Sequence, residues 1–325
     1  MSEPIIRWGI IGCGDVTEVK SGPAFSKVPG SKLVAVMRRN AAKAQDYAER
    51  HGVGKWYSDA TELINDPDVN AIYVATPPLQ HEAYTLQALN AGKPVYVEKP
   101  MAIDAQAAAR MAQAAQETGV KLCVAHYRRQ QPLFLKIKSL LEEGAIGAPR
   151  LVNLHCLQPH DSTLIPKPDE AWRYNPAVSG GGLFYDLAPH QLDLMLYFFG
   201  KPKKANGISH NASRLYGADD TTGGQVLFPN NVLFNGSWCF TVPEKRDYCE
   251  IIGTEGSLQF KIFEHRQLTW KKGEHEIHFE FEPLPHVQQP MIQRVVDYFL
   301  GKAKNPCSAD EGVDVMEMMD RIVGK

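Results

Sequence analysis

Short apolar runs alternate with helical stretches over the first 125 residues of the chain. The runs are rich in valine and isoleucine, which is typical of strands that are buried on both faces of a parallel sheet. Two of the helical stretches end at Gly92 and Gly119, where glycine supplies the left-handed residue that closes a helix. This alternation predicts an α/β fold with a doubly wound parallel sheet. The predicted strands are 8–11, 33–36, 71–75, 95–97 and 122–125, and the predicted helices are 41–51, 81–91 and 105–118.

The pattern changes after Tyr127. Longer segments carry threonine and aromatic residues, and turn residues at 229–231 and 253–256 separate them, which is typical of antiparallel hairpins. Helical spacing returns over 132–143, 187–199 and 309–323. We therefore predict a doubly wound domain at residues 1–122 and an α+β domain with a large open, mainly antiparallel sheet at residues 123–325.

The composition excludes several classes of protein. A formal net charge of -2 gives no basic surface of the kind that nucleic acid or an anionic membrane attracts. The first residues, MSEPIIRWG, lack the charged and apolar regions of a signal peptide, and we expect a cytoplasmic protein that binds neither nucleic acid nor membrane. The six cysteines are scattered and the eleven histidines form no HExxH pattern, so we predict reduced thiols and no metal.

The first predicted strand ends in a glycine-rich turn, GIIGCG at residues 9–14. Gly12 can make the tight turn, and Gly14 can let backbone N–H groups approach a pyrophosphate, as in Rossmann domains that bind dinucleotides. Thr17 occupies the third position of that pattern, and Glu18 adds a negative charge nearby. The predicted pyrophosphate contacts are Gly12, Gly14, Asp15 and Val16. A glycine-rich turn without a ligand is the alternative.

Two arginines follow the second predicted strand, in the segment VMRRN at residues 36–40. A Rossmann domain that prefers NAD usually has an acid here to hold the ribose 2'-hydroxyl, whereas arginine accommodates a 2'-phosphate. Arg38 and Arg39 can make charge-assisted bonds to that phosphate and can stack on adenine. We therefore predict NADP in preference to NAD. A solvated basic loop explains the two arginines equally well without the glycine turn.

Three further motifs follow in order along the chain. They are ATPPLQH at residues 75–81, GKPVYVEKP at 92–100 and GGGLFYDLAPHQLD at 180–193. Together with the glycine turn and with GTEGS at 253–257, they span nearly the whole chain. In this set and in this order the sequence resembles the glucose-fructose oxidoreductase and inositol dehydrogenase family, often called Gfo/Idh/MocA.

The resemblance implies positions around the cofactor. Thr76, Pro77, Leu79 and His81 would line the cofactor groove. Glu98 would lie near the nicotinamide ribose, and the lysine that follows it would also contact the cofactor.

The resemblance further implies that Lys99 projects toward the substrate oxygen, while Asp186 and His190 face the nicotinamide from the second domain. Hydride transfer at a carbinol carbon needs an acid or base at the oxygen, because an alkoxide in an apolar pocket is costly. Imidazole titrates near working pH, and Asp186 lies one helical turn before His190, where it can orient the ring. We predict catalysis by Lys99, Asp186 and His190 through a Lys-His relay. A surface lysine, a helix-capping aspartate and a structural histidine are the alternatives.

Polar and aromatic residues follow the last predicted strand, HYRR at 126–129, at the edge where open α/β sheets bind ligands. We take Tyr127 and Arg128 as substrate contacts, although helix capping and ion pairs explain this segment equally well. Trp172 and Arg173 resemble substrate-side residues of the family, since a sugar can pack on the indole and bond to the guanidinium. The predicted substrate site is completed by Lys99, Asp186 and His190.

These features predict an NADP-dependent oxidoreductase that moves a hydride between nicotinamide and a hydroxyl or carbonyl carbon of a sugar, an inositol or a related polyol. One alternative is a non-catalytic, cofactor-bound sensor or scaffold, which the three retained catalytic residues disfavour. Another is NAD-dependent glycoside cleavage through transient oxidation, which Arg38 disfavours. The second domain would bind substrate, and its open sheet needs cover, so we predict a homodimer or homotetramer.

Overall fold

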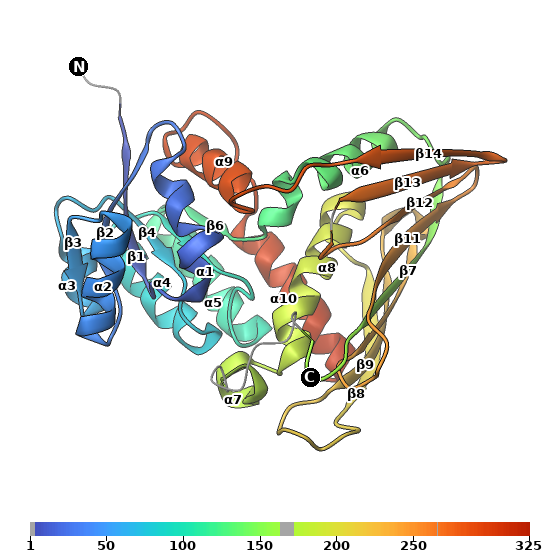
Figure 1. Cartoon of the computed structure of the whole chain (residues 1–325), viewed down its shortest axis with the longest axis horizontal. Helices are drawn as coiled ribbons and strands as arrows, with labels where there is room; N and C mark the ends of the chain where they lie inside the picture. The colour runs from blue at the N-terminus through green and yellow to red at the C-terminus, as the bar shows by residue number, and fades with distance from the viewer. Residues whose placement is uncertain (1–3, 163–171, 265) are drawn as a thin grey trace. The chain divides into compact units, whose positions relative to one another are not determined.

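The computed structural model describes residues 4–162, 172–264 and 266–325. The chain divides into two compact units. Unit 1 holds the chain up to Arg128 together with Leu284–Val313, and unit 2 holds Arg129–Pro283 together with Asp314–Lys325. Each unit is built around its own sheet (Figure 1).

The sheet of unit 1 is parallel, with six strands in the described residues and the order β3-β2-β1-β4-β5-β6. This is the order of a doubly wound Rossmann sheet, in which the crevice for a ligand opens where the order reverses beside β1. The predicted parallel sheet is confirmed. The strands are β1 (Ile6–Ile11), β2 (Ser31–Met37), β3 (Lys55–Tyr57), β4 (Ala71–Val74), β5 (Val95–Val97) and β6 (Leu122–Val124).

Capping residues fix the helices of unit 1 between these strands. Asn40 and Asp104 each accept a bond from the backbone N–H three residues later, at the starts of α2 and α5. Gly52 and Gly119 end the same two helices with positive φ angles of 65° and 66°. The helices are α1 (Asp15–Val19), α2 (Ala41–His51), α3 (Ala60–Asn65), α4 (His81–Asn90) and α5 (Ala105–Thr118).

The later segment Leu284–Val313 also belongs to unit 1, which a contiguous boundary at residues 122/123 does not anticipate. Its helix α9 (Gln289–Phe299) presents an apolar face to the sheet, and the ring centroid of Phe299 lies 5.5 Å from that of Trp8. Lys121 ties the segment down further, because its Nζ donates to the carbonyl of Tyr298 at 2.8 Å. Tertiary packing of this helix therefore brings a distant segment into the first unit.

The sheet of unit 2 has eight strands in the described residues, in the order β14-β13-β12-β11-β7-β10-β9-β8. All neighbours are antiparallel except β7 and β10, which are parallel. The predicted open, mainly antiparallel sheet is confirmed. The strands are β7 (Pro149–Leu157), β8 (Lys204–His210), β9 (Thr221–Leu227), β10 (Leu233–Cys239), β11 (Arg246–Gly253), β12 (Ser257–Phe260), β13 (Gln267–Lys272) and β14 (His275–Glu280).

Helices pack on one face of this sheet (Figure 1). Strand β7 alternates, so that Val152, Leu154 and Cys156 are buried while the residues between them are half-buried. The indole N–H of Trp238 donates to Gln191 Oε1 at 2.6 Å, which fixes a helix to the centre of the sheet. The helices of unit 2 in the described residues are α6 (Pro132–Glu142), the short α7 (Pro176–Ser179), α8 (Leu183–Phe199) and the C-terminal part of α10 (Ala309–Val323). None of the helices in the described residues is long and apolar enough to cross a membrane.

Candidate functional site

Most of the predicted cofactor residues lie in loops at the carboxyl edge of the unit 1 sheet. The glycine turn follows β1, Arg38 follows β2, Thr76 follows β4 and Lys99 follows β5. Backbone bonds hold the strand ends level, since Ala75 N donates to Ile11 O at 2.9 Å. Because all six strands are parallel, these loops share one edge of the sheet.

Gly12 occupies a position that only glycine tolerates. Its φ is 95°, and a Cβ there would lie 2.8 Å from Thr76 Cγ2 and 2.9 Å from the carbonyl carbon of Ala75. The N–H groups of Gly12 and Cys13 both donate to the carbonyl of Met37, at 2.9 and 3.1 Å. Gly14 then begins α1, which carries Asp15 and Val16. The turn therefore has the tight geometry that close approach to a pyrophosphate requires.

The structure explains why Thr17 fits where the pattern has a smaller residue. Its side chain is fully buried, and its hydroxyl donates to the carbonyl of Gly14 at 2.7 Å. Its own carbonyl accepts a bond from the Tyr47 hydroxyl at 2.8 Å, which ties α1 to α2. Hydrogen bonding thus compensates for the extra bulk.

Glu18 does not present an uncompensated charge beside the turn. Arg50 donates two bonds of 2.8 Å to its carboxylate, and His51 Nε2 lies 2.8 Å from Oε2. The bonds from Arg50 are the main reason that the pKa of Glu18 falls to about 2. Glu18, which departs from the usual glycine-turn pattern, is therefore held in an ion pair with Arg50 of α2.

The two arginines after β2 differ in exposure. Arg38 is half-buried, and its Nη1 donates to the carbonyl of Cys13 at 3.3 Å, so its guanidinium lies against the glycine turn. Arg39 is exposed, and Asn40 caps α2. A half-buried guanidinium at this place fits the position of a ribose 2'-phosphate.

The loop after β4 contains one polar atom that a ligand can satisfy. The hydroxyl oxygen of Thr76 is buried and has no hydrogen-bond partner within the described parts of the chain. Pro77 begins the short turn that follows, and Leu79 is 42% exposed. Buried polar groups without partners are uncommon, so Thr76 favours a bound molecule at this edge.

His81 lies in the interior of unit 1 and is fully buried, whereas the resemblance placed it along the groove. Its Nδ1 lies 2.9 Å from Pro100 O and its Nε2 lies 2.7 Å from Thr76 O. Burial lowers the pKa of His81, so the neutral ring donates to one of these carbonyls at a time. The residue ties the loop after β4 to the loop after β5.

Glu98 and Lys99 follow β5. Glu98 is 5% exposed, and its Oε1 accepts bonds from the Tyr73 hydroxyl at 2.5 Å and from Gln288 Nε2 at 2.6 Å. Its Oε2 accepts the backbone N–H of Lys99 at 3.1 Å. Lys99 is half-buried and precedes a cis peptide bond to Pro100. Both oxygens of this carboxylate are therefore engaged by the protein.

The residues after β6 are buried. Tyr127 and Arg128 are each 6% exposed, and the Arg128 guanidinium lies 5.5 Å from the centroid of the Tyr127 ring. In unit 2, Arg129 forms a buried ion pair with Asp193, whose Oδ1 lies 2.7 Å from Nη2. The ion-pair alternative therefore holds for Arg129, while the substrate roles of Tyr127 and Arg128 stay predictions.

A glycine run positions helix α8 in unit 2. Gly182 has a φ of 75°, and a Cβ there would lie 2.3 Å from Ala218 Cβ, so a larger residue does not fit. Asp186 lies in the first turn of α8, and His190 follows one turn later. His190 is 6% exposed, and its ring packs edge-on against Phe263 with centroids 5.9 Å apart.

Arg173 links two of the predicted substrate residues. Its Nε lies 3.3 Å from Asp186 Oδ2, and its guanidinium lies 4.4 Å from the centroid of the Trp172 ring. The structure thus brings Trp172, Arg173 and Asp186 together within unit 2. The ion pair was not predicted, because the two residues are thirteen positions apart and share no pattern.

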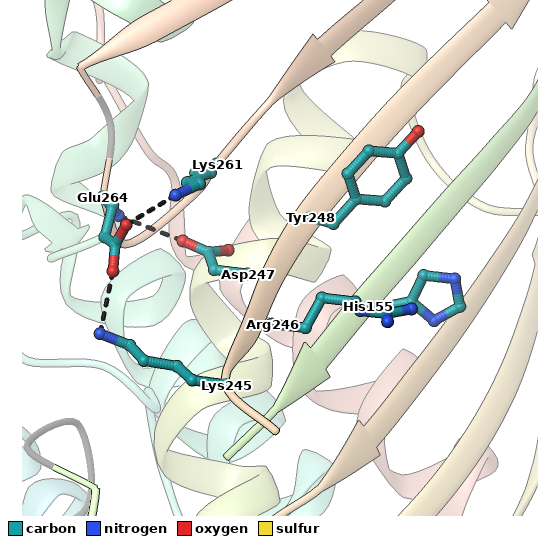
Figure 2. Close-up of a pocket in the computed structure, with 7 residues that line it drawn as sticks. All are labelled: His155, Lys245, Arg246, Asp247, Tyr248, Lys261 and Glu264. Atoms are coloured by element: carbon teal, nitrogen blue, oxygen red, sulfur yellow. Dashed lines mark hydrogen bonds and ion pairs between the residues drawn. The ribbon is translucent and has the colours of Figure 1, made fainter. Parts of the chain in front are cut away.

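A hollow of about 500 Å³ lies elsewhere in unit 2 and contains none of the predicted residues (Figure 2). Lys245 and Lys261 both pair with Glu264, at 2.9 and 2.8 Å, and Arg246 pairs with Glu244. Its cations are therefore compensated, and we assign it no role. It is lined by His155, Lys245, Arg246, Asp247, Tyr248, Lys261 and Glu264. Over the residues that the structure describes, no group of three or more His, Cys, Asp and Glu side chains could hold a metal ion.

The sheet order and the glycine turn define a dinucleotide-binding Rossmann unit that is joined to an α+β unit. Comparison with known proteins agrees. A family model described as an oxidoreductase family with an NAD-binding Rossmann fold matches residues 6–126, and the GFO/IDH/MocA C-terminal domain matches residues 134–259. The chain belongs to the Gfo/Idh/MocA oxidoreductase family. It is an NAD(P)-binding enzyme, and its relatives include a reductase of an anhydro sugar and an inositol dehydrogenase.

Individual relatives match over most of their length. Oxidoreductase P35 of Formosa agariphila is 45% identical over 99% of this chain and 99% of its own. The 1,5-anhydro-D-fructose reductase of Ensifer adhaerens is 33% identical over 78% of this chain and 74% of its own. Among solved structures, a levoglucosan dehydrogenase in complex with NADH and levoglucosan superposes with a TM-score of 0.86 at 22% identity, covering 98% of this chain and 96% of its own.

Proposed function

We propose that the protein catalyses NADP-dependent hydride transfer between nicotinamide and a hydroxyl or carbonyl carbon of a sugar, an inositol or a related polyol. The observation that supports this best is the carboxyl edge of the unit 1 sheet, where the phosphate turn, Arg38 and Lys99 follow neighbouring strands. The Gly12 turn and the buried Thr76 hydroxyl fit a bound dinucleotide. The relatives that act on anhydro sugars support the substrate class.

Each proposed catalytic residue has a separate task. The nicotinamide, when bound, supplies or accepts the hydride. The Lys99 ammonium stabilises negative charge that develops on the substrate oxygen. His190 takes up or returns the proton of that oxygen, and Asp186 keeps the imidazole oriented. Arg173 Nε lies 3.3 Å from Asp186 Oδ2, and this ion pair holds the carboxylate in place.

The remaining proposed contacts bind rather than react. Gly12, Gly14, Asp15 and Val16 would hold the pyrophosphate and Arg38 with Arg39 the 2'-phosphate. On the substrate side, the Trp172 indole offers an apolar surface for the C–H face of a sugar ring. Cofactor contacts after β4 and β5 are proposed for Thr76, Pro77, Leu79, Glu98 and Lys99, and further substrate contacts for Tyr127, Arg128 and Arg173.

Titration with each dinucleotide tests the cofactor preference. We expect NADPH to bind at least about tenfold more tightly than NADH, because a charge-assisted contact to the 2'-phosphate contributes roughly 1.5 kcal/mol or more. Arg38→Ala should remove most of that difference. The levoglucosan dehydrogenase structure contains NADH, so the fold alone does not favour NADP. Equal or tighter binding of NADH by the unaltered protein would refute the role of Arg38.

A panel of sugars, inositols, anhydro sugars and osones, followed by nicotinamide absorbance, tests the activity. Lys99→Ala and His190→Ala should each lower kcat about a hundredfold and change dinucleotide affinity less than about threefold. Lys32→Ala, at an exposed position on β2, is the matched control. A fully active Lys99→Ala protein would remove this lysine from the mechanism. Dinucleotide that survives purification and never exchanges would instead indicate glycoside cleavage by transient oxidation.

A further inference from the structure

A buried hydrogen-bond network lies behind the turn that carries Lys99. Its centre is the Glu98 carboxylate, which accepts bonds from Tyr73, from Gln288 and from the backbone of Lys99. Burial raises the pKa of Tyr73 well above its usual value, so its phenol keeps the proton that it donates. The network therefore holds the lysine turn through an interior carboxylate.

Gln288 reaches this network from far along the chain. It is fully buried, and it lies 190 residues after Glu98 in the segment that returns to unit 1. Its backbone N–H donates to Lys20 O at 3.2 Å, and its Oε1 accepts the Tyr96 hydroxyl at 3.4 Å. These bonds connect the residue before α9 to the end of α1, to β5 and to the turn after β5.

The side chain of Gln288 is not needed to begin helix α9. It stands at the N-cap of that helix, where serine, threonine, asparagine or aspartate usually bonds to a backbone N–H. No such side-chain bond is made by Gln288, and its amide reaches Glu98 Oε1 at 2.6 Å instead. The position of this amide is thus explained by Glu98 and not by the helix.

We propose that Gln288 is a positioning residue for Lys99. Its amide holds the Glu98 carboxylate, and that carboxylate holds the backbone N–H at the base of the Lys99 side chain. This inference rests on the proposed function, in which Lys99 meets the substrate oxygen. Without the amide, the buried Glu98 Oε1 keeps only the Tyr73 hydroxyl as a donor. The carboxylate, and with it the turn, is then held less firmly.

The first test needs no cofactor and no substrate. Gln288→Met keeps the length of the side chain and removes its hydrogen bonds. In the ligand-free protein, we expect the backbone amides within 97–101, where residue 100 is proline and has none, to exchange hydrogen about tenfold faster, since their local opening costs less free energy. Gln293→Met, at a half-buried position on the same helix, is the control. Unchanged exchange at 97–101 would overturn the proposal, and circular dichroism checks that the variant is folded.

The second test uses kinetics. Gln288→Met should lower kcat about tenfold while the KM for dinucleotide stays within about threefold, because only the placement of Lys99 changes. Gln288→Glu can donate to Glu98 only while its own carboxyl is protonated, so turnover should approach that of the unaltered protein at low pH and fall as pH rises. The other titratable groups near Glu98 are Tyr73, His81, Tyr96 and Lys99. These groups are present in the unaltered protein and in both Gln288 variants, so a pH dependence of turnover that is seen in Gln288→Glu alone is due to the substitution.

The outcomes separate this inference from the proposed function. If Lys99→Ala is inactive while both Gln288 variants match the unaltered protein in exchange and turnover, Gln288 has no positioning role. If Lys99→Ala is fully active while Gln288→Met still speeds exchange at 97–101, the lysine assignment fails but the structural link between Gln288 and the turn stands. Slower turnover in Gln288→Met together with faster hydrogen exchange at 97–101 supports both the positioning role of Gln288 and the proposed role of Lys99.

Discussion

Charge compensation at single residues decides whether the glycine turn can accept an anion. Glu18 lies in the one-turn helix directly after that turn, where a bare carboxylate would repel a pyrophosphate. The Arg50 guanidinium of α2 pairs with it, and His51 Nε2 lies 2.8 Å from its Oε2. The unusual residue in the motif is therefore tolerated because a second element supplies its partner.

Arg50→Ala should weaken dinucleotide binding about fivefold, because Glu18 would lose the guanidinium that compensates its charge near the phosphates. Fluorescence titration with NADPH measures the change. The double variant Arg50→Ala with Glu18→Gln should recover most of the affinity, since the repulsive charge is gone. Unchanged affinity in the single variant, or no recovery in the double variant, would show that Glu18 does not act on the cofactor.

At the scale of elements, the parallel sheet was predictable because strands buried on both faces leave uninterrupted apolar runs. Helices 41–51 and 105–118 were predicted with the bounds of α2 and α5, since both have a capping residue and a terminal glycine. Strand β3 was missed because it has three residues and is not buried. Helix α8 begins four residues before the predicted start, in a run that is apolar on all sides and has no clear period.

The site was predictable where it depends on strand ends and not where it depends on distant contacts. Parallel strands deliver the residues after them to one edge, which places Gly12, Arg38 and Lys99 without knowledge of packing. The bond from Gln288 to Glu98 joins residues 190 positions apart, and no local pattern predicts it. The interior place of His81 likewise depends on the loop after β5.

The buried pair of Arg129 and Asp193 anchors α8 to the segment before α6. Its side chains are 2% and 1% exposed. Asp193→Ala should lower the free energy of unfolding by about 3 kcal/mol, because it leaves a buried guanidinium uncompensated. Urea unfolding measures the loss. Glu142→Ala removes an exposed partner of Lys138 and should cost less than about 0.5 kcal/mol. A loss below about 1 kcal/mol for Asp193→Ala would contradict this role.

At the scale of the whole molecule, the outer face of the unit 2 sheet carries rows of side chains that run across the strands. One row is apolar, with Leu227, Leu233, Leu151 and Ile252 in register on four neighbouring strands, half-buried or exposed. The next row is polar, and within it Gln225 Nε2 donates to Asn235 Oδ1 at 2.9 Å. Amides both donate and accept, so such a row can pair with its own copy.

We therefore expect the protein to form a homodimer or homotetramer through this face, because a second copy would bury the exposed side chains of the open sheet. Light scattering at micromolar concentration should give a mass of two or four chains. Leu233→Lys, at a residue that is 36% exposed, should shift the population to smaller species, because a charge would be buried in the contact. Gln45→Lys, on the exposed side of α2 in unit 1, should leave the mass unchanged. A monomeric mass for the unaltered protein would contradict the predicted oligomer. An assembly that Leu233→Lys leaves intact would show that the contact between copies does not involve this face.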